Sequence, residues 1–97
     1  MQKALRLEPN DAQAHNNLGV ALEAAGRLSE AMVHYNEAIH LKPDYCRARN
    51  NLATALMGAG RFKEAADQFR AILRVKPDDD MARSNLRRAL SAMQPSQ

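Results

Sequence analysis

The sequence predicts an all-α fold built from antiparallel helix-turn-helix repeats, and three observations lead to this prediction. The composition favours Ala, Leu and Met, with four aromatic residues and no Trp, which is typical of close-packed helices. The chain matches itself at an offset of 34 residues. Glycine and proline recur at that same offset, at positions where they would end helices.

The internal repeat is the strongest signal in the sequence. When residues 12–45 are laid over residues 46–79, fourteen positions are identical, whereas unrelated sequences would share about two or three. In the first copy these are Ala14, Asn16, Asn17, Leu18, Ala21, Leu22, Ala25, Gly26, Arg27, Glu30, Ala31, Lys42, Pro43 and Asp44. The same frame continues past both ends of the two copies. We therefore expect a partial repeat at 1–11, whole repeats at 12–45 and 46–79, a capping helix at 80–94 and a disordered tail at 95–97.

Apolar residues at helical spacing predict two helices in each whole repeat, with a turn between them. In the first repeat the second helix carries the apolar series Ala31, Tyr35, Ala38, Ile39 and Leu41. The expected apolar face of the first helix consists of Ala14, Leu18, Ala21, Leu22 and Ala25.

Glycine, proline and aspartate mark the ends of these helices. Gly26 and Gly60 suit the left-handed residue that ends a first helix. Pro43 and Pro77 stop a second helix, because proline cannot continue the hydrogen-bond ladder. The residues that offer N-caps at the next helix start are Asp11, Asp44 and the run Asp78 to Asp80.

On these residues the chain resembles the tetratricopeptide repeat family, whose period is also 34 residues. The family's pattern is matched in order by Leu18-Gly19, Leu22, Ala31, Tyr35 and Pro43, and again by Leu52-Ala53, Leu56, Ala65, Phe69 and Pro77. The resemblance implies repeats stacked in a right-handed superhelical solenoid, with the first helices lining a concave groove. It also implies a non-catalytic scaffold that binds a protein or peptide.

The last helix departs from the pattern in a way that indicates a cap. Arg87 stands where Gly19 and Ala53 would let two helices approach closely. A long cation there would obstruct the packing of another paired helix. We therefore expect this helix to be a C-terminal cap that presents a polar face to solvent.

The candidate ligand contacts are residues on the first helices. Asn17, Asn51 and Asn85 recur at the 34-residue offset and would form a ladder of carboxamides that bonds to the backbone of an extended peptide. The resemblance to the repeat domain of O-linked N-acetylglucosamine transferase is carried by two local strings, His15-Asn16-Asn17-Leu18 and Arg83-Ser84-Asn85-Leu86. The simpler interpretation is that asparagine here is only a polar residue tolerated beside a packed leucine. The other contacts, expected mainly on an open flank, are Gln13, Asn16, Val20, Arg47, Asn50, Thr54 and Arg88.

Three alternatives accompany this interpretation. Incomplete repeat ends, with Leu5, Leu7, Leu90 and Met93, would allow homo-oligomers to form. An RNA-binding helical repeat is the lesser alternative, because the net charge is only +3 and the groove lacks aromatic residues that stack on bases. The carboxylate clamp for chaperone tails, found in another subgroup of the family, matches mainly at Asn51.

The remaining residue chemistry predicts no enzyme, cofactor or metal site. Cys46 has no activating partner in a recognisable pattern. His15, His34 and His40 lack the i, i+4 spacing of a helical metal site, so we expect His15 at a helix–helix contact and the other two at the surface. No apolar run is long enough to span a bilayer, and residues 1–11 are too charged for a signal peptide, which predicts a soluble protein, cytoplasmic by default.

Overall fold

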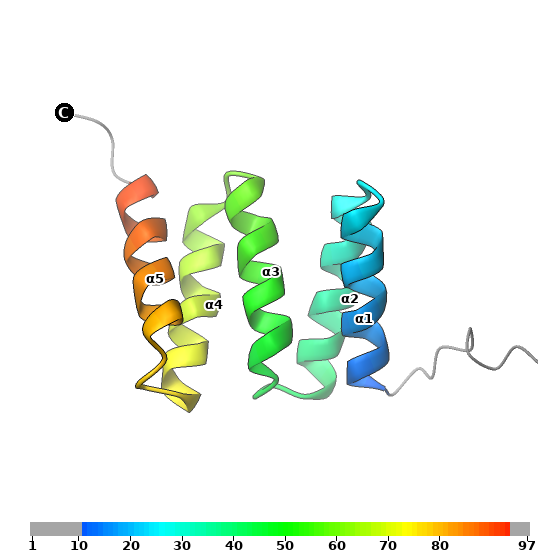
Figure 1. Ribbon diagram of the computed structural model, residues 1–97, viewed down its shortest axis with the longest axis horizontal. Helices are drawn as coiled ribbons and strands as arrows, with labels where there is room; N and C mark the ends of the chain where they lie inside the picture. Colours follow the sequence, from blue (N-terminus) through cyan, green and yellow to red (C-terminus); the bar gives the residue numbers. More distant parts are fainter. Residues whose placement is uncertain (1–10, 94–97) are drawn as a thin grey trace, which may run out of the picture. The chain divides into compact units, whose positions relative to one another are not determined.

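The computed structural model describes residues 11–93, which form five α-helices and no strand (Figure 1). The chain divides into two compact units that part between Tyr45 and Cys46. The first unit contains α1 (Ala12–Ala24) and α2 (Leu28–Leu41), and the second contains α3 (Cys46–Gly58), α4 (Phe62–Val75) and α5 (Asp80–Met93). The predicted all-α fold of helix-turn-helix repeats is confirmed. Leu5, Leu7, nearly all of the predicted partial repeat, and the predicted tail lie outside the described residues.

A glycine closes the turn between α1 and α2, and another closes the turn between α3 and α4. Gly26 has φ +81° and Gly60 has φ +77°, the left-handed region that favours glycine. In the first unit the Arg27 N–H donates to the Leu22 carbonyl at 2.8 Å, and the Gly26 N–H donates to the Glu23 carbonyl at 3.0 Å. The second unit repeats this Schellman pattern around Gly60. Both glycines therefore have the role that the sequence predicts.

A proline follows the end of each second helix. Lys42 and Lys76, the residues before Pro43 and Pro77, have φ/ψ of −143°/87° and −129°/81°. Both residues lie outside the helical region, which a following proline disfavours because its ring clashes with the helical conformation of the residue before it. The proline positions thus set where α2 and α4 end.

Aspartate side chains cap two of the first helices. The Ala14 N–H donates to Oδ1 of Asp11 at 3.0 Å, and the Ala82 N–H donates to Oδ1 of Asp79 at 3.0 Å. Each carboxylate also lies at the positive end of a helix dipole, which adds to the stabilisation. The predicted caps at Asp11 and within the Asp78 to Asp80 run are therefore present.

In the first unit α1 packs against α2 with a face that the apolar pattern does not predict. Its buried residues are His15, Asn16 and Gly19, whereas Leu18 is only half-buried. The reason is that the fully buried ring of Tyr35 lies against Gly19, which turns this side of α1 toward α2. The residues of the predicted apolar face that are exposed are Ala21 and Ala25.

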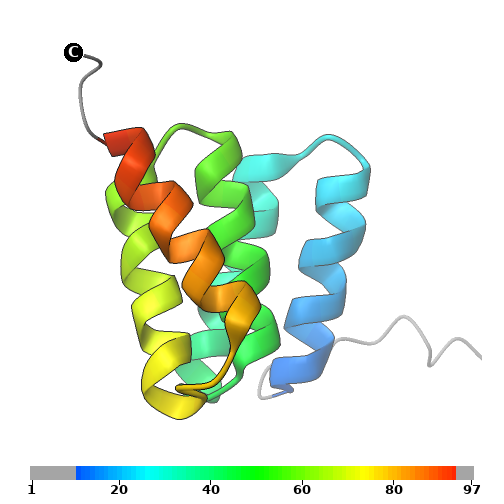
Figure 2. The same cartoon turned by 60° about the vertical axis from the view of Figure 1, so that its left-hand side comes forward.

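In the second unit α4 packs against both α3 and α5, and Figure 2 shows α5 crossing in front of the other two helices. Phe69 and Ile72 are the large buried side chains of α4, and Ala82 and Ala89 are the buried residues of α5. Arg87 is exposed, and within residues 11–93 no further helix follows α5. α5 therefore has only one packed side among the described elements.

Candidate functional site

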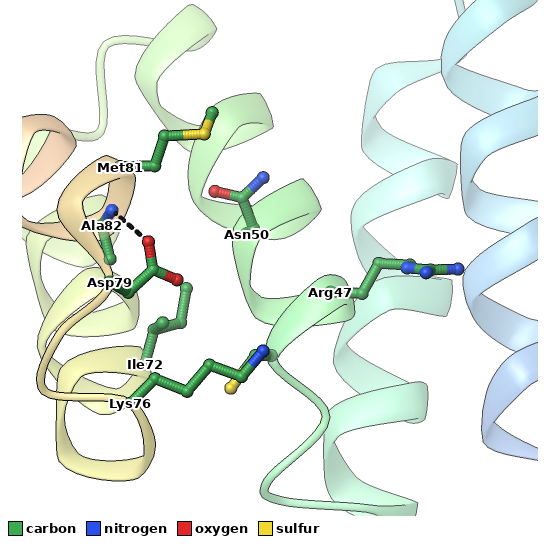
Figure 3. A pocket seen from close by; sticks show the side chains of 8 residues that line it. Arg47, Asn50, Ile72, Lys76, Asp79, Met81 and Ala82 are labelled. Carbon is green, nitrogen blue, oxygen red and sulfur yellow. Dashed lines mark hydrogen bonds between the residues drawn. The ribbon is translucent and has the colours of Figure 1, made fainter.

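A pocket of about 250 Å³ opens in the second unit, where α3 begins, α4 ends and α5 begins (Figure 3). It belongs to this unit alone. The residues that line it are Cys46, Arg47, Asn50, Ile72, Lys76, Asp79, Met81 and Ala82. Ligand sites for small molecules usually exceed about 300 Å³. The pocket is therefore of a size for one side chain rather than for a cofactor.

The floor of the pocket is apolar and rigid, and one of its walls is adjustable. Ile72 and Ala82 are each only 2% exposed, so the packing of the second unit fixes them. Met81 is 68% exposed and stands on the α5 side, with Asn50 of α3 on the other side (Figure 3). A flexible methionine beside a fixed floor allows the pocket to fit side chains of different shape.

The turn between α4 and α5 supplies two of the charged groups of the pocket, Lys76 and Asp79. The Asp79 N–H donates to the Lys76 carbonyl at 3.1 Å, which closes a turn around Pro77. One oxygen of the Asp79 carboxylate accepts the capping bond from Ala82. The Lys76 side chain runs along one edge of the pocket toward the start of α3, whereas Arg47 points away from the other labelled side chains (Figure 3). Lys76 is therefore the cation best placed to meet a ligand.

The two units carry opposite net charge. Residues 46–93 contain ten Lys and Arg against five Asp and Glu, whereas residues 11–45 contain two against five. The pocket thus lies in the basic part of the chain, and the field of the second unit favours acidic ligands.

The sequence-predicted contacts of the second unit fall into two groups. Arg47 and Asn50 line the pocket. Asn51 and Asn85 are half-buried, and neither lines it. The remaining two, Thr54 and Arg88, are exposed outside the pocket, and the Thr54 hydroxyl donates to the Asn50 backbone carbonyl at 2.8 Å.

In the first unit Gln13, Asn17 and Val20 are exposed, as a contact residue requires. Asn16 is only 2% exposed, so its expected place on an open flank is wrong. The physical reason is helical geometry. Asn16 lies three residues before Gly19, so both belong to the buried face, which Leu18 was expected to define.

Sequence reasoning missed most of the pocket, because it placed ligand contacts only on first helices. Asp79 was expected only as a possible helix cap, and neither Lys76 nor Met81 was expected to contact a ligand. One signal was present in the repeat comparison. In the first unit the Lys42 ammonium lies 5.1 Å from the centre of the Tyr45 ring, and Asp79 replaces this tyrosine in the second. That substitution leaves a carboxylate where the first unit has a ring.

The expectation that His34 lies at the surface is wrong, because the antiparallel packing of α1 and α2 places it against His15. The Nδ1 atoms of the two rings are 3.1 Å apart. His34 is half-buried and His15 is 8% exposed. The two residues are nineteen positions apart, so the spacing within one helix could not reveal the contact.

Paired helices with glycine turns, repeated along the chain and carrying a small surface pocket, define a helical-repeat protein that presents a binding surface. Two family models, each described as tetratricopeptide repeat, match residues 22–90 and 1–32. The chain belongs to the tetratricopeptide repeat family. Its repeats indicate a scaffold for protein–protein interaction, and such scaffolds are typically non-catalytic.

The crystal structure of the MamA protein has a similar fold, with a TM-score of 0.84 and 22% sequence identity. The match covers 89% of this chain and 47% of that one, so the chain spans about half the length of MamA. No curated protein sequence matches the chain. No helix within residues 11–93 is long and apolar enough to cross a membrane.

Proposed function

We propose that this chain is a non-catalytic scaffold that binds an acidic peptide segment of a partner protein, with one side chain of the peptide seated in the second-unit pocket. The observation that carries the proposal is a side-chain-sized pocket with buried apolar lining and a lysine along one edge, in a unit of net positive charge. Family membership supports protein binding as the general role.

A glutamate fits the groups that surround the pocket. Its methylene stem would pack on Ile72 and Met81, and its carboxylate would accept a charge-assisted hydrogen bond from the Lys76 ammonium. Asn50 offers two N–H donors and a carbonyl acceptor to the peptide backbone beside it. Because the peptide would have one anchoring side chain and few asparagine contacts, we expect a Kd in the micromolar range. This corresponds to a binding free energy of about −8 kcal/mol.

The asparagine series remains part of the proposal. Asn51 and Asn85 would hold the peptide backbone beyond the pocket, and Asn17 is their counterpart in the first unit. Gln13 and Val20 would add contacts on the first unit, while Arg88 would add positive charge on the second. This arrangement uses backbone bonds for affinity and the pocket for selectivity.

A peptide-display selection against the purified chain tests the proposal. We expect enrichment of Glu and Asp, and a binding isotherm for one selected peptide that weakens about tenfold with Lys76→Ala, since a hydrogen bond to a charged group contributes about 1.5–3 kcal/mol. Asn50→Ala and Asn85→Ala should weaken the same peptide. Lys76→Glu should shift the selection toward basic peptides.

Two matched variants control for charge and residue type. Lys63→Ala removes an exposed cation of α4 outside the pocket, and Asn36→Ala removes an exposed asparagine of α2. Neither should change the isotherm. If Lys76→Ala and Asn50→Ala bind the selected peptide as the wild type does, the pocket is not the site.

Self-association is a second candidate function, favoured by the apolar end of α5. Met93 is 44% exposed and Leu90 is half-buried, with no later helix among the described residues to cover them. Sedimentation of the chain and of Leu90→Asp at high concentration tests this candidate. A wild-type dimer that the substitution dissociates supports it, and a monomer at all concentrations excludes it.

A further inference from the structure

His15 of α1 and His34 of α2 direct ring nitrogens at one another inside the first unit. Their Nδ1 atoms are 3.1 Å apart, their ring centres are 5.3 Å apart, and their planes differ by 20°. The distance between the ring centres is longer than the distance between the Nδ1 atoms. The difference is close to the sum of the two distances from a ring centre to its own Nδ1, so both nitrogens lie near the line that joins the centres. The rings therefore lie edge to edge, and one Nδ1 donates a hydrogen bond to the other.

From this geometry we propose that His15 and His34 bind one divalent transition-metal ion of the kind that prefers imidazole ligands, such as Zn²⁺, Ni²⁺ or Cu²⁺. These ions bind an imidazole nitrogen at about 2.0–2.1 Å, so two nitrogens at angles between square and tetrahedral are about 2.8–3.4 Å apart. The observed 3.1 Å lies within that interval. The two helices therefore hold the two ligand atoms within reach of a common ion.

Binding requires only a local rearrangement. The ring that donates the Nδ1 hydrogen bond changes to the tautomer protonated at Nε2, which frees both Nδ1 lone pairs. A rotation of each ring about its Cβ–Cγ bond then aims these lone pairs at a point beside the line between the nitrogens. Both residues lie inside regular helices, so we expect the change to be confined to their side chains.

The site is an open one. His15 is 8% exposed, and the half-buried His34 gives the ion access. Within residues 11–93 no group of three or more His, Cys, Asp or Glu side chains surrounds a common point. The described residues thus supply two ligands, and an ion held by two imidazoles is bound more weakly than in a structural zinc site with four protein ligands.

The second unit contains a natural control for this pair. The counterparts of His15 and His34 at the 34-residue offset are Arg49 and Gln68, and Nη1 of Arg49 donates to Oε1 of Gln68 at 2.8 Å. Both units thus join their first and second helices by a side-chain hydrogen bond at this point. Arginine offers no lone pair to a metal, so only the histidine pair can become a metal site.

The test is a zinc titration of the full chain without a histidine tag, in a Cys46→Ser background that removes the competing thiol. We expect one Zn²⁺ per chain by calorimetry and a rise in the Tm with zinc concentration, since binding to the folded state stabilises it. The variant His15→Arg/His34→Gln transplants the pair of the second unit. It should keep the circular dichroism of a folded chain and lose at least tenfold in zinc affinity.

Two single variants sharpen the result. His34→Gln retains one ring and should also lose zinc affinity, whereas His40→Gln removes an exposed histidine of the same helix and should bind zinc as the wild type does. For Cu²⁺, we expect electron paramagnetic resonance to detect two ligand nitrogens. Absence of binding in the wild type, or equal binding after the double substitution, would overturn the proposal.

Discussion

The ring of Tyr35 lies against Gly19 so closely that a β-carbon at position 19 would be 2.5 Å from Cε1 of the ring. Tyr35 is fully buried, and its hydroxyl donates a hydrogen bond of 2.7 Å to the Glu23 carboxylate. The ring is thus held by its contact with Gly19 and by the hydrogen bond of its hydroxyl group. α1 and α2 can approach this closely only because position 19 has no side chain.

Gly19→Ala should therefore destabilise the first unit, because the added methyl group forces the Tyr35 ring or the α1 backbone to move. Overpacking of this kind costs about 1–3 kcal/mol. Gly58→Ala is the matched control, since no atom lies within 4 Å of the added carbon and alanine favours a helix by up to about 1 kcal/mol. Denaturant unfolding of both variants measures the difference. Equal stability of the two would show that the ring can move aside.

The bond between Tyr35 and Glu23 should show strong coupling in a double-mutant cycle. In the second unit the counterparts are Phe69 and Met57, an apolar pair. Glu23→Met alone leaves a buried hydroxyl without its acceptor, at a cost of about 1–3 kcal/mol, while the double variant with Tyr35→Phe should be nearly neutral. The free energies of unfolding of the four proteins give the coupling. Additive single effects would contradict this prediction.

Tyr35 should also make the chain sensitive to alkaline pH. Burial, the hydrogen bond to Glu23 and the charge of that carboxylate raise the pKa of Tyr35 above its usual value of about 10. In the unfolded chain this phenol ionises near pH 10, whereas in the folded chain it stays protonated. Its contribution to stability is therefore complete below pH 10 and declines as pH rises above it. Comparing the Tm of wild type and Tyr35→Phe between pH 8 and 11 measures that decline, which the variant should lack.

The glycine turns should be equally sensitive in both units. Gly26→Ala and Gly60→Ala place a β-carbon at φ +81° and +77°, which costs about 1–2 kcal/mol, although the site has open space around it. Thermal unfolding of each single variant tests the expectation. A loss in one unit and none in the other would mean that the Schellman turns differ in the stability they confer.

Much of the fold could be predicted from the sequence, because its signals act over short distances. The glycine turns depend on a backbone conformation that only glycine adopts easily, and Pro43 and Pro77 constrain the residues directly before them. Asp11 and Asp79 bond to N–H groups three residues away. Each of these features is decided within one helical turn, so repeat periodicity was enough to locate it.

The candidate site was predicted less well. Arg47 and Asn50 were placed correctly on a first helix, but Lys76 and Asp79 come from the end of α4 and the turn after it. A pocket forms where three chain segments meet, and no single helical pattern describes such a meeting. For Lys76 and Asp79 themselves, the replacement of Tyr45 by Asp79 in the second repeat is the signal that the sequence offers.

By itself the sequence determined the repeat frame, the helices and the positions of their ends, since local backbone preferences and hydrogen bonds fix them. The tertiary structure alone decided that Asn16 is buried, that His15 meets His34, and that Lys76 runs along one edge of a pocket. These outcomes depend on how each helix is rotated against its neighbour. That rotation is set by the packing of side chains such as Tyr35 against Gly19, which lie far apart in the sequence.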